Sequence, residues 1–243
     1  MTHHAPVPLR RTARPSLATR GLDERPGAQA WVMPLLSDAE AEASWETIWG
    51  MSGQQPPVAI KADLLDAWAQ PHRHCHGMRH LRECLSLWSA WVEHCQRADE
   101  VGLALWFSGA VCSPRSGDNA SRNATWAARA LAATPTSFER TQRIHDLVLA
   151  AGGSRQVLHP DADLIADIAL AHLGSPAQRF AARELELRRE RPWLGRAAYR
   201  LQRVAVLQHL LAEPRIFRTD VAWSLLERQA RANLAMACER LAA

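Results

Sequence analysis

The sequence predicts an all-α protein, and three observations support this fold class. Apolar residues recur at the 3.6-residue spacing of an amphipathic helix over several long segments. Two capping boxes, Ser37-Asp-Ala-Glu40 and Thr136-Ser-Phe-Glu139, mark helix starts. No convincing run shows the period-2 alternation, bounded by turns, of a half-buried strand. We therefore expect one helical domain over residues 35–243, with roughly nine or ten helices and no internal repeat.

In the first half of the chain, helices are expected at about residues 37–49, around 64–68 and at 78–95. The third carries one apolar stripe at helical spacing: Met78, Leu81, Cys84, Leu85, Trp88, Val92 and Cys95. Residues 101–111 are apolar nearly all round, which is typical of a buried central helix. A loop with Pro114 follows this segment.

Further helices in the second half are bounded by capping and turn residues. Asp118 is expected to cap the first of them, and Gly174 is a natural left-handed stop. Ser175-Pro176, an N-cap followed by a first-turn proline, opens another. These helices are expected at about residues 118–131, 136–151, a short stretch ending at 174, 176–190, 196–211 and 219–241.

Composition limits the function classes. With 243 residues, 47% of them hydrophobic, the chain has enough apolar side chains for a substantial core. A formal net charge of +4 does not by itself indicate nucleic-acid binding. Lys61 is the sole lysine, so the basic residues are arginines, which suit bidentate contacts to carboxylate or phosphate. Five cysteines without a C-x-x-C pair argue against a disulfide scaffold and fit a reducing compartment, the cytoplasm.

The N-terminal residues 1–34 are expected to form a disordered basic tail. They carry Arg10, Arg11, Arg14 and Arg20 without the apolar stretch of a secretory signal. No apolar run of the chain approaches the roughly 18 residues of a membrane span, so no membrane partner is expected. The oligomeric state is left open.

Residues 71–81 are the first candidate for a functional site. The segment reads Pro-His-Arg-His-Cys-His-Gly-Met-Arg-His-Leu and holds four of the eleven histidines. Imidazoles bind metals and transfer protons near neutral pH. His76 and His80 stand four residues apart, so they face the same way on a helix. The alternative is a loop of exposed or capping histidines.

The segment 69–81 resembles the opening motif of the bacterial predicted metal-dependent HD-superfamily phosphohydrolases, Pro-His-Arg-x-Tyr-His-x-Leu-x-His-Leu. Further segments follow that family's pattern in order and spacing over about residues 37–241. They are residues 103–107, 118–119, 167–174, 188–190, 199–207, 214–219 and 230–234. The resemblance implies an HD-domain-like helical bundle.

The resemblance also implies a site in which a His, a His-Asp doublet and a later Asp hold divalent metal. Such a metal lowers the pKa of a bound water that attacks phosphorus. By resemblance, His80 is the first ligand, Asp167 the last, and His76 a proton donor or orienting group. Ala169 stands where the family has a second acid.

The chain departs from the family where the chemistry is expected. The His-Asp doublet reads Ser108-Gly109, and the family's Thr-x-His-His reads Ala151-Gly-Gly-Ser154. The Asp-Asn-Glu motif has become Asp118-Asn119-Ala120. His80 and Asp167 alone fall short of the three protein ligands that a catalytic metal normally uses.

The sequence therefore predicts a catalytically inactive HD-family protein, a pseudoenzyme that binds or senses a nucleotide or other phosphate ligand in the remnant pocket. Arg203 matches a family arginine and is expected to reach a phosphate, with Arg73 and Asp118 as further ligand-binding residues. No cofactor is expected. Glu184 and Glu190 are expected to pair with nearby arginines on a solvated helix face.

Two alternatives stay open. One is an active phosphomonoesterase or phosphodiesterase that uses Mn, Mg, Fe or Zn at a displaced site. The residues available for that site are His72, His74, His159, Asp161 and Asp163. The other is an interaction module that binds a protein or nucleic acid. Cys112 and Ser108 are weaker candidates for a nucleophile, and a packing role is favoured for Cys112.

Overall fold

The computed structural model describes residues 34–242, and these form ten α-helices with no strand. The all-α prediction is thus confirmed for the described part of the chain. The predicted N-terminal tail, apart from Pro34, lies outside the described residues. The helices are α1 (Asp38–Met51), α2 (Val58–Trp68), α3 (Met78–Ala90), α4 (Ala98–Ser108), α5 (Asn119–Ala132), α6 (Phe138–Ala151), α7 (Ala162–Leu170), α8 (Ala177–Arg189), α9 (Arg196–Ala212) and α10 (Asp220–Ala242).

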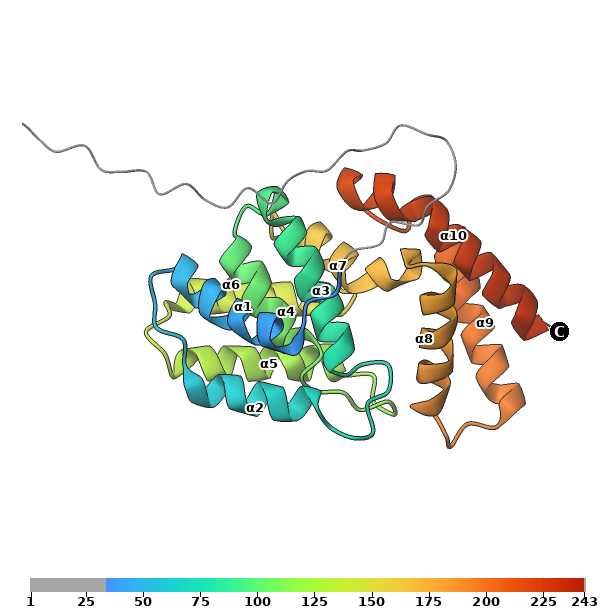
Figure 1. Cartoon of the computed structure of the whole chain (residues 1–243), viewed down its shortest axis with the longest axis horizontal. Coiled ribbons are helices and arrows are strands. Elements are labelled where there is room, and N and C mark those ends of the chain that lie inside the picture. Colours follow the sequence, from blue (N-terminus) through green and yellow to red (C-terminus); the bar gives the residue numbers. More distant parts are fainter. Residues whose placement is uncertain (1–33, 243) are drawn as a thin grey trace, which may run out of the picture.

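Helix α4 is the buried centre of the fold, as its sequence predicts. It packs against α1, α3, α5 and α6 (Figure 1), and Leu103 to Phe107 are almost fully buried. Trp68 of α2 and Trp45 of α1 contact α4 through Trp106. Trp68 of α2 donates a hydrogen bond to the carbonyl oxygen of Trp106 at 2.8 Å, and Trp106 packs edge-on against Trp45 of α1. Their apolar rings contribute to the core, and the indole N–H of Trp68 is hydrogen-bonded, whereas that of Trp45 has no partner among the described residues.

Helix starts and ends follow the sequence pattern closely, with several differences. The left-handed stop expected at Gly174 is wrong, since the positive-φ glycines of the described chain are Gly53 and Gly153. Ser175 does not cap α8, because its hydroxyl donates to the carbonyl oxygen of His172. Ser37 forms the expected capping box with Glu40. At α6, Ser137 rather than Thr136 is the N-cap, since the Thr136 hydroxyl lies 2.8 Å from that of Thr134. Asp118 holds the N-cap position of α5 without a side-chain capping bond. The third helix stops at Ala90, and a short 3-10 turn (Val92–His94) follows.

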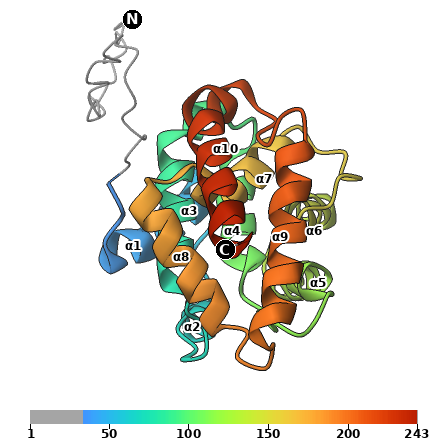
Figure 2. The same cartoon turned by 90° about the vertical axis from the view of Figure 1, so that its right-hand side faces the viewer.

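The last three helices form one end of the molecule. Viewed from that end, α10 lies between α8 and α9 (Figure 2). A second 3-10 turn, Ala171–Gly174, joins α7 to α8 and packs against α10. A Cβ on Gly174 would overlap Leu226 of α10, so this glycine permits a close approach of the two elements.

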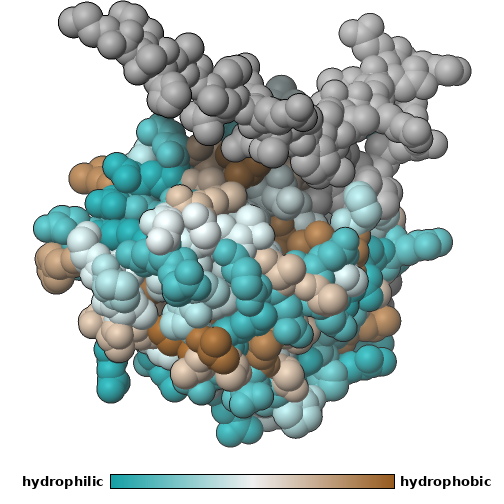
Figure 3. Space-filling view, turned by 60° about the vertical axis from the view of Figure 1, so that its left-hand side comes forward, coloured by the Kyte–Doolittle hydropathy of each residue, from teal (hydrophilic) through white to brown (hydrophobic). Residues whose placement is uncertain are grey.

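The surface carries both hydrophilic and apolar side chains (Figure 3). The face in Figure 3 is largely hydrophilic, with apolar side chains in small separate patches. None of the helices over residues 34–242 is both long and apolar enough to cross a membrane.

Candidate functional site

A cavity of about 380 Å³ lies where α3, the loop after α4, the start of α5, the end of α6 and α8 meet. We call it the histidine cavity, because His76, His80 and His172 line it together. These residues come from segments far apart in the sequence. The other lining side chains with polar groups are Ser108, Cys112, Ser113, Ser116, Asn119, Asn123, Arg183, Glu190 and Arg191.

Glu190 holds the backbone and the ring of His76. One carboxylate oxygen accepts hydrogen bonds from the backbone N–H groups of Cys75 and His76, at 2.7 and 2.9 Å. The other lies 2.6 Å from His76 Nδ1. Burial alone would raise the pKa of Glu190, but these hydrogen bonds outweigh it and lower the pKa to about 2. An ionised carboxylate only accepts, so Nδ1 of His76 is the donor in this contact.

The prediction that Glu190 lies on a solvated helix face is therefore wrong. Its side chain is 2% exposed, whereas that of His76 is 38% exposed. The carboxylate faces inward because α8 ends beside the 71–77 loop.

His80 and His172 are two half-buried imidazoles that meet edge to face, with ring centroids 6.1 Å apart. Burial, reinforced by the charge of Arg183, holds the pKa of each ring well below its usual value. Both rings are therefore neutral at pH 7. His172 Nδ1 lies 3.1 Å from the carbonyl oxygen of Ala169, which only accepts, so Nδ1 carries the proton. The free Nε2 of His172 is then an acceptor.

Arg183 supplies a buried positive charge at the cavity. Its side chain is 5% exposed, and Nη1 donates to the carbonyl oxygen of Cys75 at 3.3 Å. Glu83 Oε2 lies 3.6 Å from the same nitrogen. Arg191 lines the cavity as a second cation. Since the lining carboxylate, that of Glu190, is already paired, the site favours an anion over a cation.

The position where the resemblance would place the His-Asp doublet is closed by packing. Ser108 and Gly109 both line the cavity, but the Ser108 hydroxyl donates to the carbonyl oxygen of Leu105 at 3.0 Å. A Cβ on Gly109 would overlap the indole ring of Trp68. At the other glycine position, a Cβ on Gly152 would overlap the Cβ of Ala120. Neighbouring side chains therefore fill the space that larger ligating side chains would need.

The residues present do not fit a divalent metal of the kind the resemblance implies. Within residues 34–242, one trio of metal-ligating atoms lies within 4.8 Å: those of Cys75, His76 and Glu190. Burial raises the pKa of the Cys75 thiol to about 12, so in the metal-free protein this group is a neutral thiol at pH 7. The carboxylate of Glu190 is occupied by three hydrogen bonds.

Asp167, the expected last ligand, does not share the cavity with His80. Its buried carboxylate accepts hydrogen bonds from the backbone N–H groups of Arg218 and Thr219, at 2.9 and 2.8 Å, and from the Thr219 hydroxyl at 2.7 Å. Asp167 thus fixes the segment that leads into α10. Ala169, two residues later, lines the cavity in its place.

Arg73 is buried and structural. Its guanidinium donates to the side chain of Gln70 and to the carbonyl oxygens of His76, Gly109 and Ala110. All five N–H groups of the guanidinium are hydrogen-bonded, so Arg73 holds the 70–76 loop against the end of α4. It has no free donor for a ligand.

Asp118 and Arg203 also lie apart from the histidine cavity. Asp118 is exposed, 4.0 Å from Arg122, and accepts a hydrogen bond from Ser116. Arg203 makes a bidentate pair with Glu184, with Nε 2.9 Å from the carboxylate. The expectation that Arg73, Asp118 and Arg203 converge with the histidines on one ligand is not met by this geometry.

The residues considered for a displaced metal site are scattered. His72 and His74 are exposed on the 71–77 loop. His159 and Asp161 are buried near the start of α4, where Asp161 accepts hydrogen bonds from the backbone N–H groups of Gln96 and Arg97. Asp163 pairs with Arg218 at 3.0 Å.

Cys112 lines the histidine cavity and is half-buried. Burial, together with the charge of Glu190, raises the pKa of its thiol. A thiol of this kind is not an activated nucleophile.

Sequence reasoning missed three side chains at the cavity: His172, Arg183 and Glu190. His172 is an isolated histidine in the segment before Gly174, and nothing in its spacing distinguishes it. Arg183 and Glu190 stand among alternating charges of α8, a pattern that ordinarily marks a solvated face. Their burial depends on contacts with the 71–77 loop, which no local pattern reveals.

The chain was compared with three kinds of known proteins. Neither protein-family models, nor curated proteins, nor solved structures give a match to this chain.

Proposed function

We propose that this chain is a catalytically inactive, HD-phosphohydrolase-like protein that binds a nucleotide or another phosphate-containing small molecule in the histidine cavity. One observation carries the proposal. Neutral His80 and His172 and the buried cation Arg183 converge on a cavity whose lining carboxylate, Glu190, is already paired.

The lining groups suit phosphate oxygens. Arg183 is buried, and a charge-assisted hydrogen bond in such an environment is stronger than one in water. The start of α5 adds a second favourable feature, because Asn119 and Ala120 line the cavity. Since the Asp118 side chain makes no capping bond there, first-turn N–H groups of α5 remain available to an anion.

The lack of a suitable ligand set supports a binding role over hydrolysis. Ser108 and Gly109 offer no metal ligand, and the carboxylate of Asp167 is used near α10. Without a metal-activated water, phosphate esters are extremely slow to hydrolyse. The chain's own groups therefore bind and orient an anion in this proposal.

The test is calorimetric titration with inorganic phosphate, pyrophosphate, AMP and ATP. We expect at least one of them to bind, and Arg191→Gln, which removes a cation that lines the cavity, to weaken it by about tenfold, the effect of losing one hydrogen bond to a charged group. The matched control is Arg203→Ala, which removes an arginine outside the cavity and leaves the affinity unchanged. If none of the four binds to the folded protein, the proposal fails.

A second arm distinguishes binding from catalysis. Metal content is measured on protein purified without chelator, and phosphomonoesterase and phosphodiesterase activities are assayed with Mn²⁺ and Mg²⁺. We expect neither stoichiometric metal nor turnover. Hydrolysis that is abolished by His80→Gln but retained by Arg203→Ala would establish an active enzyme and overturn the inactive assignment.

A further inference from the structure

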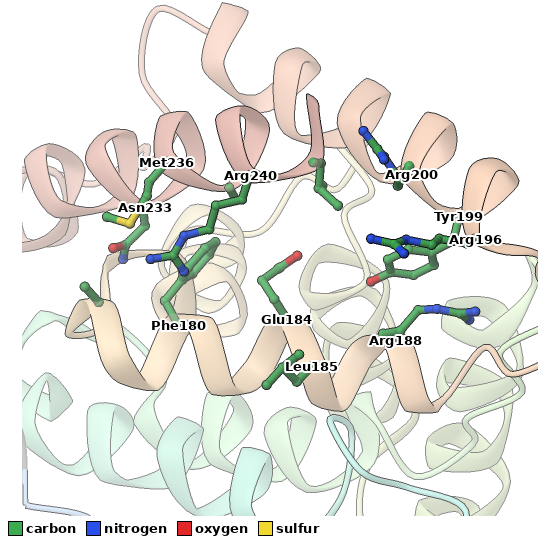
Figure 4. A pocket seen from close by; sticks show the side chains of 14 residues that line it. Phe180, Glu184, Leu185, Arg188, Arg196, Tyr199, Arg200, Asn233, Met236 and Arg240 are labelled. Carbon is green, nitrogen blue, oxygen red and sulfur yellow. The ribbon is translucent and has the colours of Figure 1, made fainter. Parts of the chain in front are cut away.

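A second cavity, separate from the histidine cavity, opens between α8, α9 and α10 (Figure 4). Its volume is about 510 Å³, and we call it the C-terminal groove. Helix α8 is the wall between the two sites. Arg183 and Glu190 of this helix face the histidine cavity, while Phe180, Ala181 and Leu185 line the groove.

The groove is long enough to receive a short helix. On α8 its lining residues run from Ala177 to Arg188 at spacings of three and four, which is one continuous helix face. That face is roughly 16 Å long at 1.5 Å per residue, about three turns. Small side chains, Ala177, Ala181 and Ala237, leave room for another backbone to approach. Leu185 is 64% exposed there. An exposed apolar side chain in a groove is typical of a surface that binds another molecule.

Positive charge lies at both ends of the groove. Arg240 lies near one end, beside Phe180, and Arg196 and Arg200 lie at the other (Figure 4). Within the described part of the chain, these three arginines have no ion-pair partner. Glu184, the lining acid, is already paired with Arg203 at 2.9 Å.

Tyr199 provides an independent sign of a missing partner. The residue is 6% exposed, and its hydroxyl has no hydrogen-bond partner within residues 34–242. The hydroxyl points into the groove between Glu184 and Arg196 (Figure 4). A buried hydroxyl left unpaired costs free energy, so such a group is ordinarily satisfied by something that binds.

We propose that the C-terminal groove is a docking site for an acidic amphipathic helix of a partner protein. Apolar residues of that helix lie on Phe180, Leu185 and Met236, and its acidic residues reach Arg196 and Arg240 at the two ends. A single-headed anionic amphiphile would neutralise one end alone. The chain's own N-terminal segment is disfavoured, because Arg10, Arg11, Arg14 and Arg20 would face the arginines of the groove.

The test uses three fluorescein-labelled peptides of about 16 residues, enough for a helix to form on binding. The first carries leucines at helical spacing on one face and glutamates on the other. The second has the same composition in scrambled order, and the third replaces each glutamate by lysine. By fluorescence anisotropy with the full chain, we expect the first peptide to bind at least about tenfold more tightly than either control.

Variants locate the binding. Arg240→Ala is expected to weaken the acidic peptide about three- to tenfold, and Ala181→Trp to abolish its binding by filling the groove. Arg228→Ala is the matched control, since Arg228 is exposed on the same helix, outside the groove, and has no ion-pair partner in the described part of the chain. Circular dichroism checks that each variant is folded. If Ala181→Trp does not fold, Arg196→Ala replaces it beside Arg240→Ala.

Three outcomes would overturn the proposal. The first is that the acidic amphipathic peptide binds no better than its scrambled form. The second is that Arg240→Ala and Arg228→Ala affect it equally. The third is that phosphatidylglycerol vesicles bind with the same dependence on Arg240 while the peptide does not, which would assign the groove to lipid. Pyrophosphate titration of Arg240→Ala keeps this test separate from that of the histidine cavity, which the variant leaves intact.

Discussion

Glu190 lies at the end of α8, and its carboxylate hydrogen-bonds His76, 114 residues earlier in the chain, at 2.6 Å. The same carboxylate accepts two backbone N–H groups of the histidine loop. This contact joins the C-terminal helices to the 71–77 loop and orients the His76 ring.

Replacing Glu190 by Gln is expected to lower the free energy of unfolding by about 3 kcal/mol. The substitution removes a buried charge that three donors share, and directs an amide NH₂ at groups that are themselves donors. Urea unfolding at pH 7 measures the change. The control is Glu46→Gln, whose side chain is 51% exposed and pairs with Lys61, with an expected change below about 1 kcal/mol. Equal effects at the two sites would contradict the structural role of Glu190.

Gly109→Ala is expected to destabilise the fold by about 1 to 3 kcal/mol, because the new Cβ overlaps the buried indole of Trp68. Gly117→Ala is the control, since a Cβ there meets no atom within 4 Å. Its stability should be unchanged or slightly higher. Both are measured by urea unfolding.

A double-mutant cycle with Trp68→Phe tests the cause of this effect. The atoms of Trp68 that a Cβ on Gly109 would meet belong to the outer ring of the indole, which phenylalanine lacks. The cost of Gly109→Ala should therefore be smaller in the Trp68→Phe background. Strictly additive effects would show that the indole does not close this position.

Asp167→Ala separates a structural aspartate from a ligand-binding one. It leaves the N–H groups of Arg218 and Thr219 without their acceptor, so the free energy of unfolding should fall by about 2 to 4 kcal/mol. Under conditions where the variant is folded, its affinity for the phosphate compounds should match that of the wild type. The reverse result, unchanged stability with an affinity about tenfold weaker, would show that Asp167 contributes to ligand binding.

Acid should destabilise the protein partly through Glu100. Burial alone would raise the pKa of this carboxyl, but the neighbouring His159 ring and the hydrogen bonds from Arg143 lower it to about 2, against 4.5 as its ordinary value. Between these values the unfolded chain binds more protons than the folded one. The contribution of Glu100 is therefore complete above pH 4.5 and is lost as the pH falls toward 2.

Urea unfolding between pH 7 and pH 3 checks this titration. Glu190, with a pKa also lowered to about 2, adds to the same window, so the wild type should lose stability steeply there. Glu100→Gln should be less stable at pH 7 by up to about 3 kcal/mol and should show a shallower decline. Parallel pH profiles for the two proteins would rule out the assigned contribution of Glu100.

Much of the helical architecture was predictable, because its signals are local. The apolar residues around Leu103 mark α4 as the central helix, and Ser37 with Glu40 marks the start of α1. The choice between Thr136 and Ser137 as N-cap was not predictable, since either hydroxyl suits the position. The interaction of Thr136 with Thr134 resolves it.

The site was predictable in part. His76 lies in the loop before α3, so the expectation that it shares a helix face with His80 is wrong, although the two ring centroids do lie 6.1 Å apart. The roles of charged residues were harder, because arginines and carboxylates have the same sequence pattern whether they face water or the interior. Arg73 donates hydrogen bonds to backbone carbonyl oxygens, and Arg203 pairs with Glu184. The residues next to them in the sequence predict neither interaction.

The sequence by itself determined that the described chain is helical and where most of its helices begin and end, since these depend on residues three or four positions apart. Tertiary structure alone decided which groups share a cavity. Packing brings Glu190 under His76, turns Asp167 toward the segment before α10, and places Trp68 where Gly109 has no side chain. Each of these contacts joins distant segments, and its energy depends on burial, which the order of residues does not state.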